Sequence, residues 1–113
     1  MSTYDMAHKL AKEIKNSDEY EDYKDKREKV LADEKAKEML FDYQKQEQKL
    51  QSKHISGEEL TEEEREEFEN LRNLIQMNTK IKNYLEAEQR ISVMLNDLQR
   101  ILFGDLEFGI FEE

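Results

Sequence analysis

Apolar residues recur at steps of three and four along most of this chain, the spacing that places side chains on one face of an α-helix. In residues 3–15 the pattern predicts a first helix, with a stripe formed by Tyr4, Ala7, Leu10, Ala11 and Ile14. Asn16 and Ser17 can cap a second helix that ends at about Leu31, and Asn16 with Glu19 has the spacing of a capping box. Its stripe is the least continuous, because charged residues separate Tyr20, Tyr23, Val30 and Leu31.

Two further helices are predicted in the middle of the chain, on either side of a glycine. Asp33 can cap a helix that extends to Ser56, with a half-polar, heptad-like stripe of Ala36, Met39, Leu40, Tyr43, Glu47, Leu50 and His54. Gly57 follows, where helices favour a left-handed residue. Thr61 and Glu64 form a capping box for the next helix, which should end near Met77 and bury Phe68, Leu71 and Ile75. Together they predict a long antiparallel helical hairpin.

The strongest pattern lies in residues 79–103, where we predict a fifth helix that Asn78 caps and Gly104 ends. Its nearly unbroken stripe consists of Ile81, Tyr84, Leu85, Ile91, Met94, Leu95, Leu98, Ile101 and Leu102. The predicted organisation is one helical domain in residues 1–104, followed by a short apolar and acidic tail in residues 105–113. We expect the apolar tail residues to fold back on the helices, with a short edge strand as the alternative; they are Leu106, Phe108, Ile110 and Phe111.

The predicted helices are too long for a rounded monomer. At 1.5 Å per residue the third and fifth helices would measure roughly 33 and 37 Å, whereas a compact chain of this size has a radius of gyration near ~13 Å. Only 36% of the residues are hydrophobic and 41% are charged, so one copy can fill only a thin core. We therefore predict an elongated, all-α fold of about five helices that forms a homodimer in which matching stripes are covered.

Charge narrows the choice of partners. The formal net charge of −10 repels nucleic-acid phosphates and anionic lipids. The basic residues between positions 24 and 29 could still contact RNA, but Asp22, Asp25 and Glu28 interleave with them, which favours a solvated, salt-bridged face. The chain has neither a secretory signal nor an apolar run of about 20 residues. We expect a cytoplasmic protein that does not bind membranes and does not bind nucleic acid directly.

The residue types also argue against catalysis, so we expect neither an enzyme nor a cofactor. The chain has no cysteine, and neither of its two histidines has a companion at metal-binding spacing. We interpret His54 as a residue near the end of its helix that interacts favourably with the negative end of the helix dipole. Three glycines cannot form a phosphate-binding loop. The glutamates of residues 58–69 are interpreted as the solvated start of a helix.

The functional candidates are therefore helix faces. The residues that best suit a shared core or a protein interface are Met39, Tyr43, Leu50, Phe68, Leu71, Ile75, Tyr84, Ile91, Leu95 and Leu98. Tyr20, Tyr23 and Tyr43 could form an aromatic patch for a partner, although their places on the apolar stripes favour the core. We expect a protein that binds other proteins through these faces.

Several groups of residues are also typical of one family. They are Tyr4, Asp5, Ala7 and Leu10, then Glu19, Tyr20 and Lys24, then Leu40, Phe41, Tyr43, Gln44, Gln48 and Gly57, and above all residues 83–102, NYLEAEQRISVMLNDLQRIL. With them, nearly the whole chain resembles the YlbF/YmcA-like family of small helical bacterial proteins, closest to its YheA branch. The chain departs from the family at residues 104–106, where relatives often carry a proline-leucine pair.

This resemblance implies a multihelical fold that commonly self-associates. In the YlbF and YmcA branches, relatives join a third protein in a complex that assists the endoribonuclease RNase Y, and they affect competence, biofilm formation and sporulation. The resemblance therefore implies a non-enzymatic adaptor or regulator, an accessory factor in RNA processing, competence or biofilm regulation. Its expected partners are itself and other proteins of an RNA-processing complex. The alternatives are a structural homodimer, a holder of a small ligand between helices, or an RNA-binding protein.

Overall fold

Five helices account for almost all of residues 2–107, the part of the chain that the computed structural model describes, and no strand is present in that part. The helices are α1 (Thr3–Lys15), α2 (Asp18–Leu31), α3 (Glu34–Ser56), α4 (Glu62–Met77) and α5 (Thr79–Phe103). The all-α fold and the five predicted helices are therefore confirmed. Their ends agree with the sequence pattern because capping residues stand at the expected places.

Four of the helices begin with a side-chain N-cap at the predicted residue or one residue away from it. The Oδ1 atom of Asp33 accepts a hydrogen bond from the Ala36 amide at 3.2 Å, and that of Asn78 accepts one from the Ile81 amide at 3.1 Å. Thr61 and Glu64 form the predicted reciprocal capping box. Each of these bonds satisfies an amide that the helix itself leaves without a partner.

The start of α2 differs from the prediction, and α1 has a cap that the sequence pattern had not brought out. Ser17, not Asn16, is the N-cap of α2, because its Oγ accepts from the Tyr20 amide at 3.2 Å; Asn16 is the last, capping residue of α1. The predicted box between Asn16 and Glu19 is therefore wrong by one residue. At the other end of α1, Ser2 and Asp5 form a capping box.

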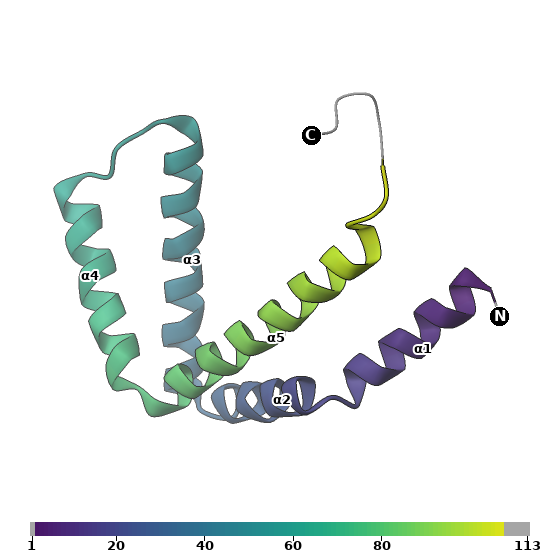
Figure 1. Cartoon of the computed structure of the whole chain (residues 1–113). Coiled ribbons are helices and arrows are strands. Elements are labelled where there is room, and N and C mark those ends of the chain that lie inside the picture. Colours follow the sequence, from purple (N-terminus) through teal and green to yellow (C-terminus); the bar gives the residue numbers. More distant parts are fainter. Residues whose placement is uncertain (1, 108–113) are drawn as a thin grey trace.

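The five helices form an elongated molecule with two arms (Figure 1). The radius of gyration is 18.5 Å and the principal extents are 54 × 39 × 15 Å, whereas a compact chain of this length would have a radius of gyration near ~13 Å. The predicted antiparallel hairpin of α3 and α4 makes one arm. The outer part of α5 and the whole of α1 point away from it on the other side.

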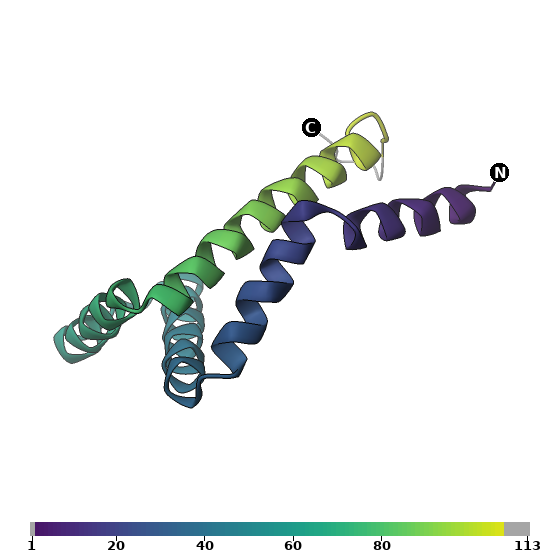
Figure 2. The ribbon, with the colours of Figure 1, turned by 90° about the horizontal axis from the view of Figure 1, so that it is seen from below.

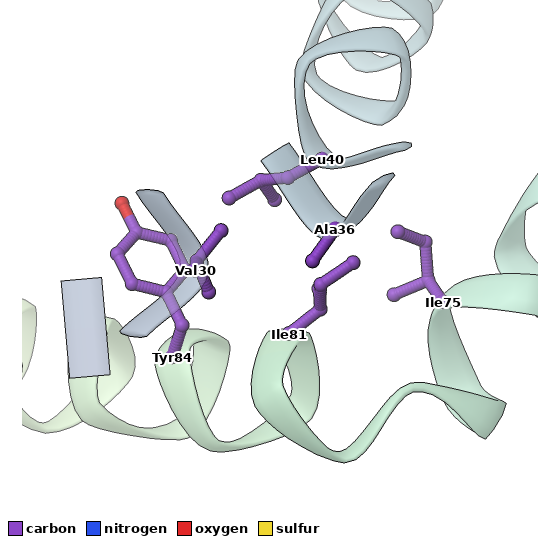
Figure 3. Packing of buried hydrophobic residues seen from close by; sticks show 6 residues of the cluster. All are labelled: Val30, Ala36, Leu40, Ile75, Ile81 and Tyr84. Carbon is purple, nitrogen blue, oxygen red and sulfur yellow. The ribbon is translucent and has the colours of Figure 1, made fainter. Parts of the chain in front are cut away.

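The core lies where the two arms meet. It is formed by the end of α2, the start of α3, the end of α4 and the start of α5 (Figure 3), and its buried members are Val30, Ala36, Leu40, Ile75, Ile81 and Tyr84. Ile81 and Ala36 are completely buried. The core is thin, as the low apolar content predicted, because only one cluster of side chains joins four helices.

The packing of α2 against α5 extends this core along one side (Figure 2). The rings of Tyr23 and Tyr84 lie with their centroids 5.6 Å apart, and Asp22 forms an ion pair with Arg90. Ala87 and Ile91 on α5 are buried as well. Although charged residues interrupt its apolar stripe, α2 is therefore the main neighbour of α5.

The α3–α4 hairpin is held by one aromatic contact and one ionic cluster. The rings of Tyr43 and Phe68 stack with centroids 5.9 Å apart. Near the tip, Glu64 pairs with Lys49 at 2.9 Å and with Lys53. Glu64 is thus half-buried, unlike the solvated start expected for the glutamates of residues 58–69; the other glutamates of that stretch are exposed. Gly57 adopts the predicted left-handed conformation at the turn, with φ of 78°.

Two stripe positions and one tail residue are not buried as predicted. Glu47 and His54 on α3 are exposed, although Glu47 lies near Glu88 of α5. Leu106 was expected to fold back on the helices and is instead 52% exposed. Phe108, Ile110 and Phe111 lie outside the described residues.

Candidate protein-interaction surfaces

The ten residues predicted to form a core or an interface are distributed over both arms and the junction. Ile75, Tyr84 and Ile91 are buried, and Leu95 is 43% exposed. The half-buried members are Met39, Tyr43, Leu50, Phe68, Leu71 and Leu98. The set therefore does not form one surface. It divides into a core, the facing sides of the α3–α4 hairpin, and the outer part of α5.

The tyrosines that could have formed a partner patch lie at the margin of the core. Tyr23 and Tyr43 pack against the buried cluster, and Tyr20 stands 6.5 Å from Tyr23, measured between ring centroids. All three are half-buried. They mainly support the packing of α2 and α3, as the favoured interpretation held.

Exposed apolar side chains gather on α1 and on the outer part of α5. α1 has no buried residue, and Tyr4 and Met6 are 81% and 51% exposed. In the outer part of α5 the exposed large hydrophobic side chains are Val93, Leu95, Ile101, Leu102 and Phe103. We call the apolar faces of α1 and of residues 92–103 the two distal faces. The sequence pattern predicted both stripes but not that each would be left without a covering helix.

A second apolar surface is a groove of about 530 Å³ at the bend between α2 and α3. Leu31 and Phe41 line it and are 44% and 57% exposed, while the rim carries charges of both signs from Arg27, Glu34 and Lys37. Neither Leu31 nor Phe41 was among the predicted interface residues. Phe41 lies outside the three-and-four spacing of its helix, and that break in the pattern is the signal that could have identified it.

Charges close to the junction are ordered by hydrogen bonds. The Tyr84 hydroxyl donates to Glu88 at 3.1 Å and lies 3.4 Å from the Tyr23 hydroxyl. Burial raises the pKa of Tyr84 far above its usual range, and the neighbouring Tyr23 and Glu88 raise it further. Burial also raises the pKa of Glu47, and the charge of Glu88 adds to this effect. The contact between the Tyr23 and Tyr84 hydroxyls links α2 to α5.

Two of the four basic residues of α2 are paired with carboxylates of the same helix. Lys26 contacts Asp22 at 3.1 Å, and Lys29 contacts Asp25 at 3.2 Å. Pairs of this kind, three or four residues apart on one helix, neutralise each other on a solvated surface. The positive charge of α2 is therefore partly balanced within the helix.

Two further features of residues 2–107 bear on the chemistry of the chain. No group of three or more histidine, aspartate or glutamate side chains is placed to hold a metal ion. Among the described helices, none is both long enough and apolar enough to cross a membrane. The hydrophobic side chains at the surface are thus the features that most call for a functional explanation.

Comparisons with known proteins agree with this architecture. A family model described as "Control of competence regulator ComK, YlbF/YmcA" matches residues 3–107. A UPF0342 protein of Halothermothrix orenii is 54% identical over 112 residues, which cover 99% of this chain and 95% of the relative. A UPF0342 protein of Bacillus velezensis is 39% identical over 104 residues, covering 92% of this chain and 90% of the relative.

A solved structure shares the fold. It is described as "Protein of Unknown Function (DUF964) from Bacillus stearothermophilus", with a TM-score of 0.77, 25% sequence identity, and coverage of 91% of this chain and 90% of the other. The UPF0342 name of the relatives is consistent with the predicted YheA branch. Because the family model spans all five helices, the chain belongs to the YlbF/YmcA family, which is linked to control of the competence regulator ComK.

Proposed function

We propose that this protein is a non-enzymatic adaptor that acts by binding other proteins, including a second copy of itself. The observation that carries the proposal is that α1, an amphipathic helix, buries none of its residues. Large exposed apolar patches are rare on soluble monomers and mark surfaces that meet a partner. The exposed side chains of α5 and of the α2–α3 groove add to this surface.

The charge of the chain indicates the class of partner. A formal net charge of −10 opposes binding to phosphate backbones, and Lys26 and Lys29 of α2 are paired with carboxylates. Exposed apolar side chains bordered by charges of both signs suit contact with another protein, because protein–protein interfaces have an apolar centre and a polar rim. We therefore place a protein, not RNA, on these faces.

Membership of the family supports a regulatory process. The family description names control of the competence regulator ComK. We infer that this chain is an accessory factor in competence, biofilm or RNA-processing control, in which it would hold a partner protein and not transform a substrate.

Affinity capture from a lysate of the native organism tests this function. Full-length protein with a terminal tag should recover a second protein in stoichiometric amount, identified by mass spectrometry. A matched bait carrying Phe41→Glu, which changes the exposed groove without touching a fully buried side chain, separates partners of the groove from partners of the distal faces. Recovery of the bait alone, at native expression level and low salt, would refute the adaptor function.

A small-ligand function is the second candidate, because the α2–α3 groove has a volume of about 530 Å³. Ligand pockets commonly range from ~300 to 1,000 Å³. Native mass spectrometry of gently purified protein would then show a constant added mass, and Phe41→Glu should remove it. Protein of unmodified mass in every preparation would count against this alternative.

A further inference from the structure

α1 is a helix that needs a covering surface. Isolated helices shorter than about 12–15 residues are marginal in water, and most helical stability in proteins comes from packing of the apolar face. α1 has 13 residues and buries none of them. Its apolar face carries Tyr4, Met6, Ala7, Leu10, Ala11 and Ile14, while the opposite face carries His8 and three lysines. Within the described residues α1 contacts only α2.

The outer part of α5 has the same need. Met94, Leu95, Leu98 and Leu102 recur at steps of three and four and continue the stripe that is buried further back at Ile91. The first turns of α2 lie beside this part of α5, where Asp22 pairs with Arg90. Further along, Met94 and Leu98 are half-buried, whereas Leu95 and Leu102 are exposed. One continuous apolar face is therefore packed in its first half and only partly covered in its second half.

The two distal faces do not meet within one chain. Figures 1 and 2 show α1 set apart from the outer part of α5, and the two helices are not in contact. The turn that sets the direction of α1 is ordered, because the Ser17 hydroxyl donates to the Ile14 carbonyl at 2.6 Å while accepting from the Tyr20 amide. Within residues 2–107 neither face therefore covers the other, and both are open to a second molecule.

The two faces match each other in length and in side-chain size. At 1.5 Å per residue, α1 and residues 92–103 each extend for roughly 20 Å. α1 offers small residues, Ala7 and Ala11, on its apolar face, whereas α5 offers the larger Leu95, Leu98 and Leu102. Large residues on one helix that face small residues on another interdigitate well. Two copies of the α5 face would instead place leucine against leucine.

The charges favour the same pairing. α1 holds three lysines and two carboxylates, so its net charge is positive in a protein of formal charge −10. The chain from residue 92 onward carries one basic residue, Arg100, against five acidic residues: Asp97, Asp105, Glu107, Glu112 and Glu113. Within residues 92–103 the charges of Asp97 and Arg100 cancel, but Asp105 and Glu107 follow directly, so residues 92–107 carry a net charge of −2. An α1–α5 contact therefore brings the net positive α1 to a net negative part of the chain, and electrostatic complementarity of this kind favours one pairing of surfaces over another.

We propose that two copies of this chain form a two-fold dimer in which α1 of each copy packs on residues 92–103 of the other. A two-fold axis makes both contacts at once, so both pairs of distal faces are covered without a further partner. This inference rests on the self-association within the proposed function and names the surfaces that carry it. The α2–α3 groove and the hairpin tip stay free for other proteins.

A complementation experiment with two charge variants tests the pairing. Leu10→Glu disrupts the α1 face, and Leu95→Glu disrupts the α5 face; neither side chain is buried in the chain itself. Sedimentation velocity should show wild-type dimer and, for each variant alone, dissociation at least tenfold stronger. A 1:1 mixture should regain dimer, because the heterodimer has one contact with both changes and one contact with neither.

Matched controls place the same new charge on the polar faces. His8→Glu on α1 and Asn96→Glu on α5 are expected to leave the dimer unchanged. Circular dichroism of each variant reports whether the helices are retained. A mixture that is no more dimeric than either variant alone would overturn the α1–α5 pairing, as would a monomeric wild-type protein at high concentration. In the second case, capture of a stoichiometric partner from lysate would leave the adaptor function standing.

Cross-linking supplies a readout that does not depend on disrupting the dimer. The chain has no cysteine, so Ala7→Cys and Leu98→Cys each introduce a single thiol. A short bis-maleimide should join one copy of each variant in a mixture, and mass spectrometry should identify the mixed product. An Ala7→Cys protein mixed with Asn96→Cys is the control. Products joined equally well in all combinations would contradict the proposed contact.

Discussion

Replacement of Ile81 by alanine tests whether the small junction holds the fold together. Ile81 is completely buried and belongs to the one cluster to which α2, α3, α4 and α5 all contribute. Ile81→Ala removes three carbon atoms from this site while keeping a good helix former on α5. The change therefore acts on packing and leaves the helix propensity almost unaltered.

The expected loss of stability follows from the buried volume. At about 0.8 kcal/mol per methylene, transfer of the lost atoms to water accounts for about 2.4 kcal/mol. A residual cavity of roughly 40–80 Å³, at about 24 cal/mol per Å³, adds about 1–2 kcal/mol. The sum, about 3–4 kcal/mol, is a large part of the 5–15 kcal/mol that typically separates folded from unfolded domains. At about 4 °C per kcal/mol, Tm should fall by roughly 12–16 °C.

Urea and thermal unfolding followed by circular dichroism would measure this loss, at one fixed protein concentration because dimerisation would couple stability to concentration. Ile55→Ala is the matched control. It makes the same chemical change at a side chain that is 79% exposed, where surface substitutions usually change stability by less than about 0.5 kcal/mol. If Ile81→Ala lowered stability no more than Ile55→Ala, the junction would not be the core.

Three further changes probe other parts of the fold. Gly57→Ala should destabilise by about 1–2 kcal/mol in urea unfolding, because Gly57 has φ of 78° and an added Cβ would meet no other atom, so only the backbone is strained. Glu64→Gln should weaken the dependence of stability on acid pH. Hydrogen bonds from Lys49 and Lys53 hold the pKa of Glu64 well below its usual range. The stabilisation that ionised Glu64 provides is therefore complete at neutral pH and is lost as the pH falls through and below that range. Tyr84→Phe should cost about 1 kcal/mol, and ultraviolet titration of the wild type should show one tyrosine that ionises only as the protein unfolds at alkaline pH, since burial raises its pKa.

Each of these changes has a control within the chain. Gly57→Asn should cost less than alanine, because asparagine tolerates the left-handed conformation. Glu66→Gln changes an exposed neighbour of the glutamate cluster and should leave the acid profile unaltered. Tyr4→Phe removes a hydroxyl that is open to solvent and should leave the late ionisation of Tyr84 in place. An equal response of variant and control would contradict the corresponding assignment.

The helices could be predicted closely from the sequence because their signals are local. Caps at Asp33, Thr61 and Asn78 depend on side chains three residues from the amides they bind. The error at Asn16 arose because two adjacent residues could each cap, and the choice depends on where α1 ends. The order and bounds of all five helices followed from such contacts together with the spacing of apolar residues.

The partners of each helix face could not be predicted in the same way. Periodicity shows that α1 and residues 92–103 have apolar faces, but it carries no information on which element covers them. His54 and Glu47 occupy stripe positions of α3 and are exposed, whereas Glu64, in a stretch of solvated glutamates, receives two lysines from α3. Such outcomes depend on how the helices cross, which long-range packing alone determines.

The hairpin of α3 and α4 joins the rest of the molecule at its base, where Ala36, Leu40 and Ile75 belong to the core and Met39 and Tyr43 pack against it. Its reach can therefore change independently of the fold: inserting the same whole number of helical turns in both helices would move the tip outward and preserve every side chain at the base. A related chain could thus contact a more distant target simply by growing longer there, while the junction that folds it stays the same.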